Sequence, residues 1–592
     1  MRLSFWLASA AAISLAACGQ APTETPAEPE NTNLQSSETT AAQTSSASEP
    51  GDMIFWGGQI YTANDDQRMV EAVVTRDGRI VYVGDEAQAQ QYFGENTRII
   101  DLNGGAMYPG FTDSHVHVLG VGSRERTLNL DAVTSIEELV QHVSETVADA
   151  GAGDVVFGRG WIETHWPEGR FPNRRDLDAV SPDHPVILVR ADGHALVANS
   201  AALDAGGISR DSVAPEGGEI LFDEAGEPTG MLIDTAMYPV SSLVSAPAGD
   251  VRADIYAEGS QRLASLGWAG AHDMSVPYAD VEMIEGLAEA DRLSTRVYVS
   301  INPGGFAELA REVPRIADDG MVITRAVKLY MDGALGSRGA ALLSPYSDRP
   351  ETSGLNIAEP DETVGVFIEA LRNGIQMNVH AIGDRGNRLL LDWVEEAQAQ
   401  VPADERALSE HRWRDEHTQI VHPDDFARFA ELGVIASMQP SHAIGDLHFA
   451  PARLGEDRLD GAYAWQTLLD HGAHLTGGSD APVEQGDPRI EFYAAVARAD
   501  LSGFQGENWR PDEALSRDDA LKLFTLWPAY ASFREDELGS IEEGKRADFT
   551  IFSGDIMTIE HADILSVTPW MTVVDGEVAW EHPDSFHHCP GC

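Results

Sequence analysis

The stretch Phe111-Thr-Asp-Ser-His-Val-His117 decides the fold of this chain. It follows the apolar run Met107–Gly110, which is typical of a strand that leads into a functional loop. Side chains two apart on a strand point the same way, so His115 and His117 aim two imidazoles at one point, with Asp113 on the same face beneath them. Imidazole is the commonest protein ligand of divalent transition metals. The pair indicates a metal site if further ligands follow; two polar residues at a strand end are the alternative.

Composition limits the classes of function. The chain has 592 residues, 43% of them hydrophobic, which predicts a globular protein of two or more structural units. A formal net charge of −56 argues against nucleic acid as a partner, because phosphates would be repelled. Three cysteines exclude a disulfide framework. Of the 40 basic residues only Lys328, Lys522 and Lys545 are lysine. A lysine inside an apolar strand therefore predicts a role that arginine cannot take.

The N-terminus predicts export. Residues 1–17 combine the basic Arg2 with the apolar run Leu3–Leu15, as a secretory signal does. The sequence Leu15-Ala-Ala-Cys18-Gly19 resembles a bacterial lipobox, which implies cleavage before Cys18, lipidation of Cys18 and anchoring in the outer membrane, facing the periplasm. An ordinary signal peptide with secretion to the periplasm is the alternative. Residues 18–51 have almost no large apolar side chains and predict a disordered linker.

The two ends of the folded part predict one β unit. Residues 52–107 alternate short apolar bursts with Gly and Asp turns, and residues 540–582 repeat this pattern. We predict a small β-sandwich built from both segments, with a large α/β domain over residues 108–539 inserted between them and a flexible tail over residues 583–592.

Inside the inserted domain, apolar strands alternate with helical patterns, which indicates a parallel α/β architecture. With the His115 strand, eight strands are predicted, the other seven being Trp268–His272, Arg296–Ile301, Ala326–Tyr330, Ile375–His380, Glu416–Val421, Val434–Met438 and His474–Gly477. Eight parallel strands favour a TIM (β/α)8 barrel, whose active site lies at the carboxyl ends of the strands. Residues 124–250, too long for a plain connection, predict an insertion domain over the barrel mouth after strand one.

Polar residues stand at four of the later strand ends, namely Lys328, His380, His417 and Asp480. Each has an ordinary explanation when taken alone, such as a buried histidine with its hydrogen bonds filled or a turn cap for Asp480. His380 shares its strand face with Asn378, and His417 is expected to share its face with Gln419. Together with His115 and His117, these residues predict a metal site.

The pattern closely resembles the amidohydrolase superfamily, and more narrowly the amidohydrolase-3 (YtcJ-like) group, whose relatives include N-substituted formamide deformylases. The motifs that carry the resemblance are Pro109–His117, Asp192–Asn199, Val327–Arg338, Asn378–Asp384, Glu416-His417 and Gly478–Pro482. The resemblance covers roughly residues 52–582 and does not specify a substrate.

The resemblance also implies a ligand set. His115 and His117 would bind the more buried ion with Asp480, His380 and His417 would bind a second ion, and Lys328 would bridge both as a carbamate. A lysine suits that role because a neutral amine can attack carbon dioxide, whereas a guanidinium stays protonated. Zinc is the expected metal, in one or two ions, with manganese or iron as alternatives.

We therefore expect a metal-dependent hydrolase that cleaves an amide-type C–N bond of a small molecule by metal-activated hydroxide, with Asp480 as general acid and base. Esterase, lactonase or deaminase activity on the same site is one alternative, and a non-catalytic binding lipoprotein is another. The membrane is expected as a partner only through the N-terminal lipid, and a homodimer stays open.

Substrate specificity is expected outside the ligand set. The candidates are Trp161, His165, Trp166 and His194 in the insertion, Arg338 after strand four, and Met438, Gln439 and His442 after strand seven. Packing is the favoured role for each tryptophan taken singly. Arg338 either receives a carboxylate or holds its Gly-rich loop. The tail His587–Cys592 is assigned no catalytic role.

Overall fold

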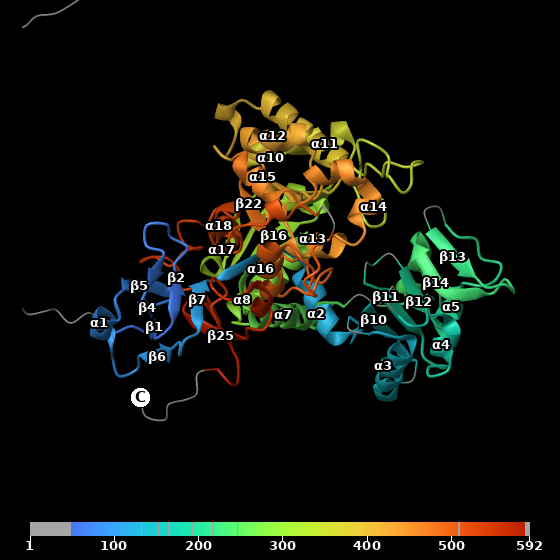
Figure 1. Cartoon of the computed structure of the whole chain (residues 1–592), viewed down its shortest axis with the longest axis horizontal. Coiled ribbons are helices and arrows are strands. Elements are labelled where there is room, and N and C mark those ends of the chain that lie inside the picture. Colours follow the sequence, from blue (N-terminus) through green and yellow to red (C-terminus); the bar gives the residue numbers. More distant parts are fainter. Residues whose placement is uncertain are drawn as a thin grey trace, which may run out of the picture. The chain divides into compact units, whose positions relative to one another are not determined.

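The computed structural model describes residues 49–585 apart from residues 132, 152, 164–165, 192, 194, 216–217, 245–246 and 507–508 (Figure 1). The predicted signal peptide, Cys18, residues 18–48 of the predicted linker, His165, His194 and the tail from residue 586 lie outside the described residues. None of the described helices combines the length and the apolarity that crossing a bilayer requires.

Eight parallel strands form the core of the α/β unit. They pair side by side in chain order, as β8 (Phe111–Val116), β15 (Trp268–Val276), β16 (Arg296–Ile301), β18 (Val322–Tyr330), β19 (Gln376–Ala381), β20 (Arg414–His417), β21 (Ile435–Met438) and β22 (Leu475–Gly477). A short strand, β17 (Arg315–Ala317), pairs antiparallel with β18. The predicted eight-stranded, TIM-like barrel is confirmed.

Helices follow the strands in the order that a (β/α)8 chain requires. They are α7 (Gly249–Leu266), α8 (Val281–Glu289), α9 (Phe306–Leu309), α10 (Pro360–Asn373), α11 (Asp384–Gln400), α12 (Phe426–Leu432), α15 (Trp465–Asp470) and α16 (Pro488–Ala497), with α17 (Arg517–Leu523) and α18 (Leu526–Ala531) after them. Many of them present an apolar face to one continuous core cluster that also takes in the strands.

Side chains close the gap between β22 and β8, where no backbone ladder forms. Ser114 Oγ lies 2.5 Å from Thr476 Oγ1. The Asp113 carboxylate accepts hydrogen bonds from the Ser479 backbone N–H at 2.9 Å and from the Ser479 hydroxyl at 2.5 Å. Gly478 has to be glycine here, because a Cβ would meet the His115 backbone nitrogen at 2.3 Å. Asp113 therefore fastens the barrel seam directly beneath the two histidines.

Strand β20 is shorter than its sequence suggests, and the prediction of a strand over Glu416–Val421 was wrong at its end. The backbone turns at His417, with φ of 83°, and at Thr418, with φ of 44°. The Thr418 hydroxyl donates to the Asp415 carbonyl at 2.8 Å, which stabilises the turn. Gln419 consequently lies beyond the strand and does not share a strand face with His417.

Strands from both chain ends meet in one sheet. A six-stranded sheet has the order β25-β24-β23-β7-β2-β3, and a four-stranded sheet has the order β5-β4-β1-β6. Their bounds are β1 (Met53–Trp56), β2 (Gln59–Tyr61), β3 (Met69–Val70), β4 (Ala72–Arg76), β5 (Arg79–Gly84), β6 (Arg98–Asp101), β7 (Ala106–Pro109), β23 (Phe549–Phe552), β24 (Pro569–Val574) and β25 (Glu577–Glu581). Phe55 and Phe549, one from each sheet, stack edge-on in a shared hydrophobic cluster. This arrangement accords with the predicted sandwich, whose domain bounds stay a prediction.

The segment between β8 and β15 has a sheet of its own, of order β13-β14-β12-β11-β10-β9. Its elements are α2 (Val118–Arg126), β9 (Leu128–Asn129), α3 (Ile136–Asp149), β10 (Val156–Trp161), α4 (Arg174–Asp178), β11 (Val186–Arg190), β12 (Ala195–Ala198), α5 (Ser200–Ala205), β13 (Gly218–Phe222), β14 (Pro228–Asp234) and α6 (Tyr238–Ser241). Hydrophobic clusters cover the sheet. A position over the barrel mouth stays a prediction.

Candidate metal centre

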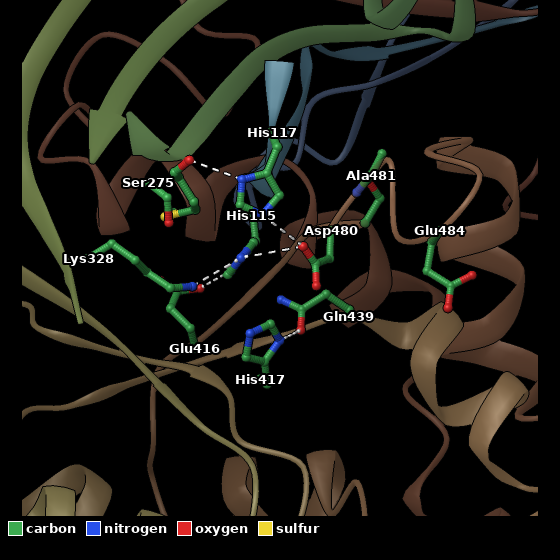
Figure 2. Close-up of polar contacts among 12 residues, drawn as sticks. His115, His117, Ser275, Lys328, Glu416, His417, Gln439, Asp480, Ala481 and Glu484 are labelled. Carbon is green, nitrogen blue, oxygen red and sulfur yellow. Dashed lines mark hydrogen bonds and ion pairs between the residues drawn. The ribbon is translucent and has the colours of Figure 1, made fainter. Parts of the chain in front are cut away.

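The predicted ligands gather at the carboxyl ends of the barrel strands (Figure 2). His115 Nε2 lies 3.2 Å from Lys328 Nζ and 3.7 Å from Asp480 Oδ1, and His117 Nε2 lies 3.2 Å from the same carboxylate oxygen. The backbone N–H of Asp480 donates to the His115 carbonyl at 2.6 Å, which ties the loop after β22 to β8. His115 and Lys328 are buried, whereas the His117 side chain is 32% exposed, so the cluster opens to solvent on the His117 side.

His417 and His380 complete the group. His115, His417 and Asp480 each offer a ligand atom, and these three atoms lie within 4.8 Å of one another, so the cluster could hold a metal ion. The His380 ring centroid is 4.5 Å from that of His417. The resemblance assigns His417 to a second ion with His380, while the compact cluster combines His417 with His115 and Asp480.

Outer hydrogen bonds fix how three of the imidazoles point. The Nδ1 atom of His115 lies 2.6 Å from Glu416 Oε2, that of His117 lies 3.0 Å from the Met274 carbonyl, and that of His417 lies 2.7 Å from Gln439 Oε1. Each of these oxygens is an acceptor, so each Nδ1 carries a proton, and the neutral rings of His115 and His417 turn an Nε2 lone pair inward. Such outer partners orient imidazoles in metal sites.

The inward-facing atoms need a positive partner. Within the described part of the chain, His380 Nε2 and Asp480 Oδ1 are buried and have no hydrogen-bond partner. His380 Nε2 comes no closer than 3.6 Å to Asp332 Oδ1. Lone pairs of neutral imidazoles beside a carboxylate repel one another, and a buried polar atom without a partner is costly. A divalent cation would satisfy all of them, so the residues present fit a metal.

Burial keeps His115 and His380 in the protonation state of a metal ligand, whereas at His117 burial is outweighed by the Asp480 carboxylate, which raises the pKa. Desolvation, assisted by the nearby Lys328 ammonium, lowers the pKa of His115 to about 4 and that of His380 to about 3. Both imidazoles are therefore neutral at pH 7, as a ligand must be. Burial also lowers the pKa of Lys328 to about 8, which makes its neutral amine accessible.

A buried polar chain continues below His115. Glu416 Oε1 lies 2.7 Å from Arg414 Nε, and Arg414 Nη1 lies 2.9 Å from His272 Nδ1. Burial would raise the pKa of Glu416, but the Arg414 guanidinium and His115 outweigh it and hold that pKa well below its usual range. Sequence reasoning missed Arg414 and His272. The alternation Arg414-Asp-Glu416 on one strand was the available signal, since it places the arginine and the glutamate on one face.

Asp332 is a second residue that sequence reasoning passed over. Its carboxylate accepts backbone N–H groups from Ala341 at 2.7 Å, Ile382 at 2.9 Å and Gly383 at 2.8 Å. It thereby joins the loop after β18 to the loop after β19, next to His380.

The predicted specificity residues divide into two groups. Gln439 and His442 lie at the centre: Gln439 holds His417, and His442 Nε2 is 3.7 Å from Asp480 Oδ2. Met438 ends β21 and is buried. Three other candidates within the described residues make contacts elsewhere: Trp161 donates to the Leu188 carbonyl at 2.8 Å, Trp166 donates to the Val133 carbonyl at 2.9 Å, and Arg338 pairs with Asp348 at 2.7 Å. The contacts of both tryptophans are those of packing residues in the insertion.

A parallel eight-stranded barrel with histidines, a lysine and an aspartate at the carboxyl ends of its strands defines a class of metal-binding barrel enzymes. Comparison with known families narrows this class. The model of the amidohydrolase family (Amidohydro_3) matches residues 98–579, and the chain belongs to this family.

Relatives match along almost their whole length. The putative amidohydrolase YtcJ of Bacillus subtilis is 32% identical, over 89% of this chain and 99% of its own. The N-substituted formamide deformylase of Arthrobacter pascens is 28% identical, over 90% of this chain and 99% of its own. Among solved structures, an uncharacterized metal-dependent hydrolase from Pyrococcus furiosus has a TM-score of 0.69 and 31% identity, over 86% of this chain and all of its own. These likenesses support a hydrolase.

Proposed function

We propose that this protein is a metal-dependent hydrolase of an amide-type C–N bond in a small molecule. The observation that carries the proposal is the convergence of His115, His417 and Asp480 ligand atoms within 4.8 Å. The direction of the imidazole lone pairs supports it, as does the deformylase among the relatives, whose name denotes C–N cleavage of N-substituted formamides.

A divalent ion, when bound, supplies an activated water molecule and an electrophile for a carbonyl oxygen. The residues that would hold it are His115, His117, His380, His417 and Asp480, with Lys328 as a carbamate bridge if two ions bind. Zinc suits the imidazoles best, and manganese or iron also suits mixed nitrogen and oxygen ligands.

Asp480 is the proposed proton carrier. Its Oδ1 atom faces His115 and His117, which leaves Oδ2 on the side of His442, 3.7 Å from His442 Nε2. The left-handed backbone at Asp480, with φ of 58°, and its hydrogen bond to the His115 carbonyl fix the carboxylate in this place. We assign Asp480 Oδ2 to take a proton from the attacking water and to deliver it to the leaving nitrogen.

Localisation rests on the sequence around Cys18 alone. We propose a lipid-anchored protein of the outer membrane that faces the periplasm, with a small-molecule amide as its substrate. Labelling of the full chain with a radioactive fatty acid, compared with Cys18→Ser, tests the anchor: label that persists in the variant would contradict it.

The test of function is a substrate panel on the purified, zinc-loaded protein. N-formyl, N-acyl and cyclic amides are assayed beside esters, lactones and amino-heterocycles, each with and without a chelator. We expect amide hydrolysis that the chelator removes and that Asp480→Asn lowers about 100-fold or more. Turnover confined to esters, lactones or amino-heterocycles would favour those activities. Ligand binding with no turnover in any arm would favour a binding protein.

A further inference from the structure

We propose that Glu484, beside His442, forms a subsite that binds a positively charged nitrogen group of the substrate. The inference rests on the proposed function, because it names the substrate class of the same centre: amides that carry an ammonium or amidinium group a short chain away from the scissile bond.

Glu484 stands on the open side of the metal centre. It lies on the loop that follows Asp480 (Figure 2), and its side chain is 31% exposed, against 32% for that of His117. Its Oε1 atom is 3.9 Å from His442 Nε2, which in turn is 3.7 Å from Asp480 Oδ2. His442 Nε2 is therefore close to the carboxyl groups of both Asp480 and Glu484.

Among the described residues, no lysine or arginine pairs with the Glu484 side chain. Within the same residues its carboxyl group makes no hydrogen bond. The guanidinium of Arg124 reaches this loop but donates to the backbone carbonyls of Glu484 at 2.9 Å and Gln485 at 2.8 Å. Two other carboxylates near the barrel mouth do have partners: Asp348 pairs with Arg338, and Asp332 accepts three backbone N–H groups.

The surroundings of Glu484 are acidic. Burial, followed by the charges of Asp446, Asp480 and Asp131, raises the pKa of Glu484 to about 8, so this carboxyl group is largely protonated at pH 7 while no cation is bound. A like-charged neighbourhood disfavours another anion and stabilises a cation that enters it. An ammonium group that enters this site would lower the pKa of Glu484 and pair with the ionised carboxylate.

His442 provides an independent sign that a ligand belongs here. The Gln419 side-chain amide donates to His442 Nδ1 at 3.1 Å, so the neutral ring carries its proton on Nε2. This N–H is buried, has no hydrogen-bond partner within the described residues, and points between Asp480 and Glu484. It is a free donor for a substrate carbonyl or another acceptor.

The same observation separates the subsite from a further metal site. His115 and His417 turn lone pairs inward, whereas His442 presents a proton and cannot ligate in this tautomer. The compact ligand cluster in the described part of the chain contains His115, His417 and Asp480 and excludes Glu484. An organic cation therefore fits the space better than a metal ion.

The test compares two formamides that differ only in charge. N-formylputrescine ends in an ammonium group, and N-formylpentylamine has a methyl group in its place. With the zinc-loaded full chain we expect kcat/KM to be at least tenfold higher for N-formylputrescine. Glu484→Gln should abolish this preference. Glu431→Gln, which removes the same charge from an exposed position on α12, should retain it. No preference in the wild-type protein, or a preference that survives Glu484→Gln, would overturn the inference.

Failure of the proposed function is separable from failure of the subsite. If neither formamide is hydrolysed, calorimetric binding of the two compounds to the zinc-loaded protein decides. Tighter binding of N-formylputrescine that Glu484→Gln removes supports the subsite, and equal binding of both overturns it. Metal content per chain is the remaining readout: Glu484→Gln should bind as much zinc as the wild type, and loss of an ion would make Glu484 a ligand and refute the proposal.

Discussion

Two buried histidines at opposite ends of the barrel look alike by burial and pKa and differ in their partners. Burial lowers the pKa of His411, just before β20, to about 4, and that of His380, near the end of β19, to about 3. His411 Nδ1 accepts the Trp413 N–H at 2.9 Å, and its Nε2 lies 2.9 Å from the Leu432 carbonyl. His380 Nε2 has no hydrogen-bond partner among the described residues. A ring nitrogen without a hydrogen-bond partner, and not burial, distinguishes His380 from His411.

The contrast extends along a single strand. Gln376 begins β19, accepts from the Tyr298 hydroxyl at 3.0 Å and donates to the carbonyls of Arg412 at 2.6 Å and Ala531 at 2.7 Å. At the amino end of the strand, the polar side chain forms hydrogen bonds that hold the barrel together. The carboxyl end leaves them open for a ligand, as expected where barrel enzymes place their chemistry.

The largest effect should follow the substitution Lys328→Arg at the open end. Arginine keeps the positive charge but its guanidinium does not lose its proton, so it cannot form a carbamate. We expect kcat to fall about 1,000-fold or more, because the metal bridge and the proton carrier act as one unit. Steady-state kinetics on the metal-supplemented variant measure this.

Lys522→Arg is the matched control. Lys522 pairs with Asp65 at 2.8 Å on the surface, where arginine can replace it. The activity of Lys522→Arg should therefore equal that of the wild type. Wild-type turnover by Lys328→Arg would contradict the carbamate bridge and remove the difference between the two lysines.

At the amino ends of the strands, Arg296→Met should lower the stability of the fold and leave the chemical step unchanged. Arg296 pairs with Asp548 at 2.6 Å and with Asp575 at 2.8 Å, and its removal leaves a buried carboxylate without a partner. The free energy of unfolding should fall by about 3 kcal/mol. Denaturant unfolding measures it, and kcat per folded, metal-loaded molecule should not change. The exposed Arg292, paired with Asp254, gives the control Arg292→Met, which should cost less than about 0.5 kcal/mol.

Glu416→Gln tests a residue that contacts both His115 in the metal cluster and the buried Arg414. The amide still accepts the His115 Nδ1–H but loses the charge that Arg414 and His115 share. Outer partners of this kind change metal affinity about 10- to 100-fold. Competition with a metal indicator should show zinc bound that much more weakly, with the fold intact by circular dichroism. Unchanged zinc affinity would mean that Glu416 serves the barrel alone.

Sequence patterns predicted the barrel and the candidate metal ligands for a physical reason. Period-two polar residues at the ends of apolar runs, such as His115 and Lys328, can be recognised without knowing the neighbours. The hydrogen-bond partners of these residues cannot be recognised in this way, because they come from distant segments of the chain. The substrate contact of Gln439 stays a prediction, and its hydrogen bond to His417 had no signal in the sequence. Glu484 carries no local signal, since its isolation appears only when the surrounding strands are assembled.

The strand end at His417 shows a different limit. The apolar residues up to Val421 continue the strand pattern, while the turn depends on two left-handed residues that no propensity favours. A hydrogen bond from Thr418 to the Asp415 carbonyl supports that conformation. The turn ends the strand at a residue of the metal cluster, and strained backbone of this kind collects at functional sites.

The smallest effect should come from His411→Gln, through pH. An unfolded histidine binds a proton near pH 6.5, whereas folded His411 does so only near its pKa of about 4. Between these values the unfolded chain holds more protons, so acid destabilises the fold. Lowering the pH from about 7.5 to about 5.5 should cost the wild type about 1 kcal/mol through His411, and His411→Gln should remove that share. The exposed His471 supplies the control His471→Gln, which is unfolded by denaturant over the same pH range. Equal pH dependence in His411→Gln and the wild type would mean that burial does not lower the pKa of His411. His411 and His380 would then no longer share this property.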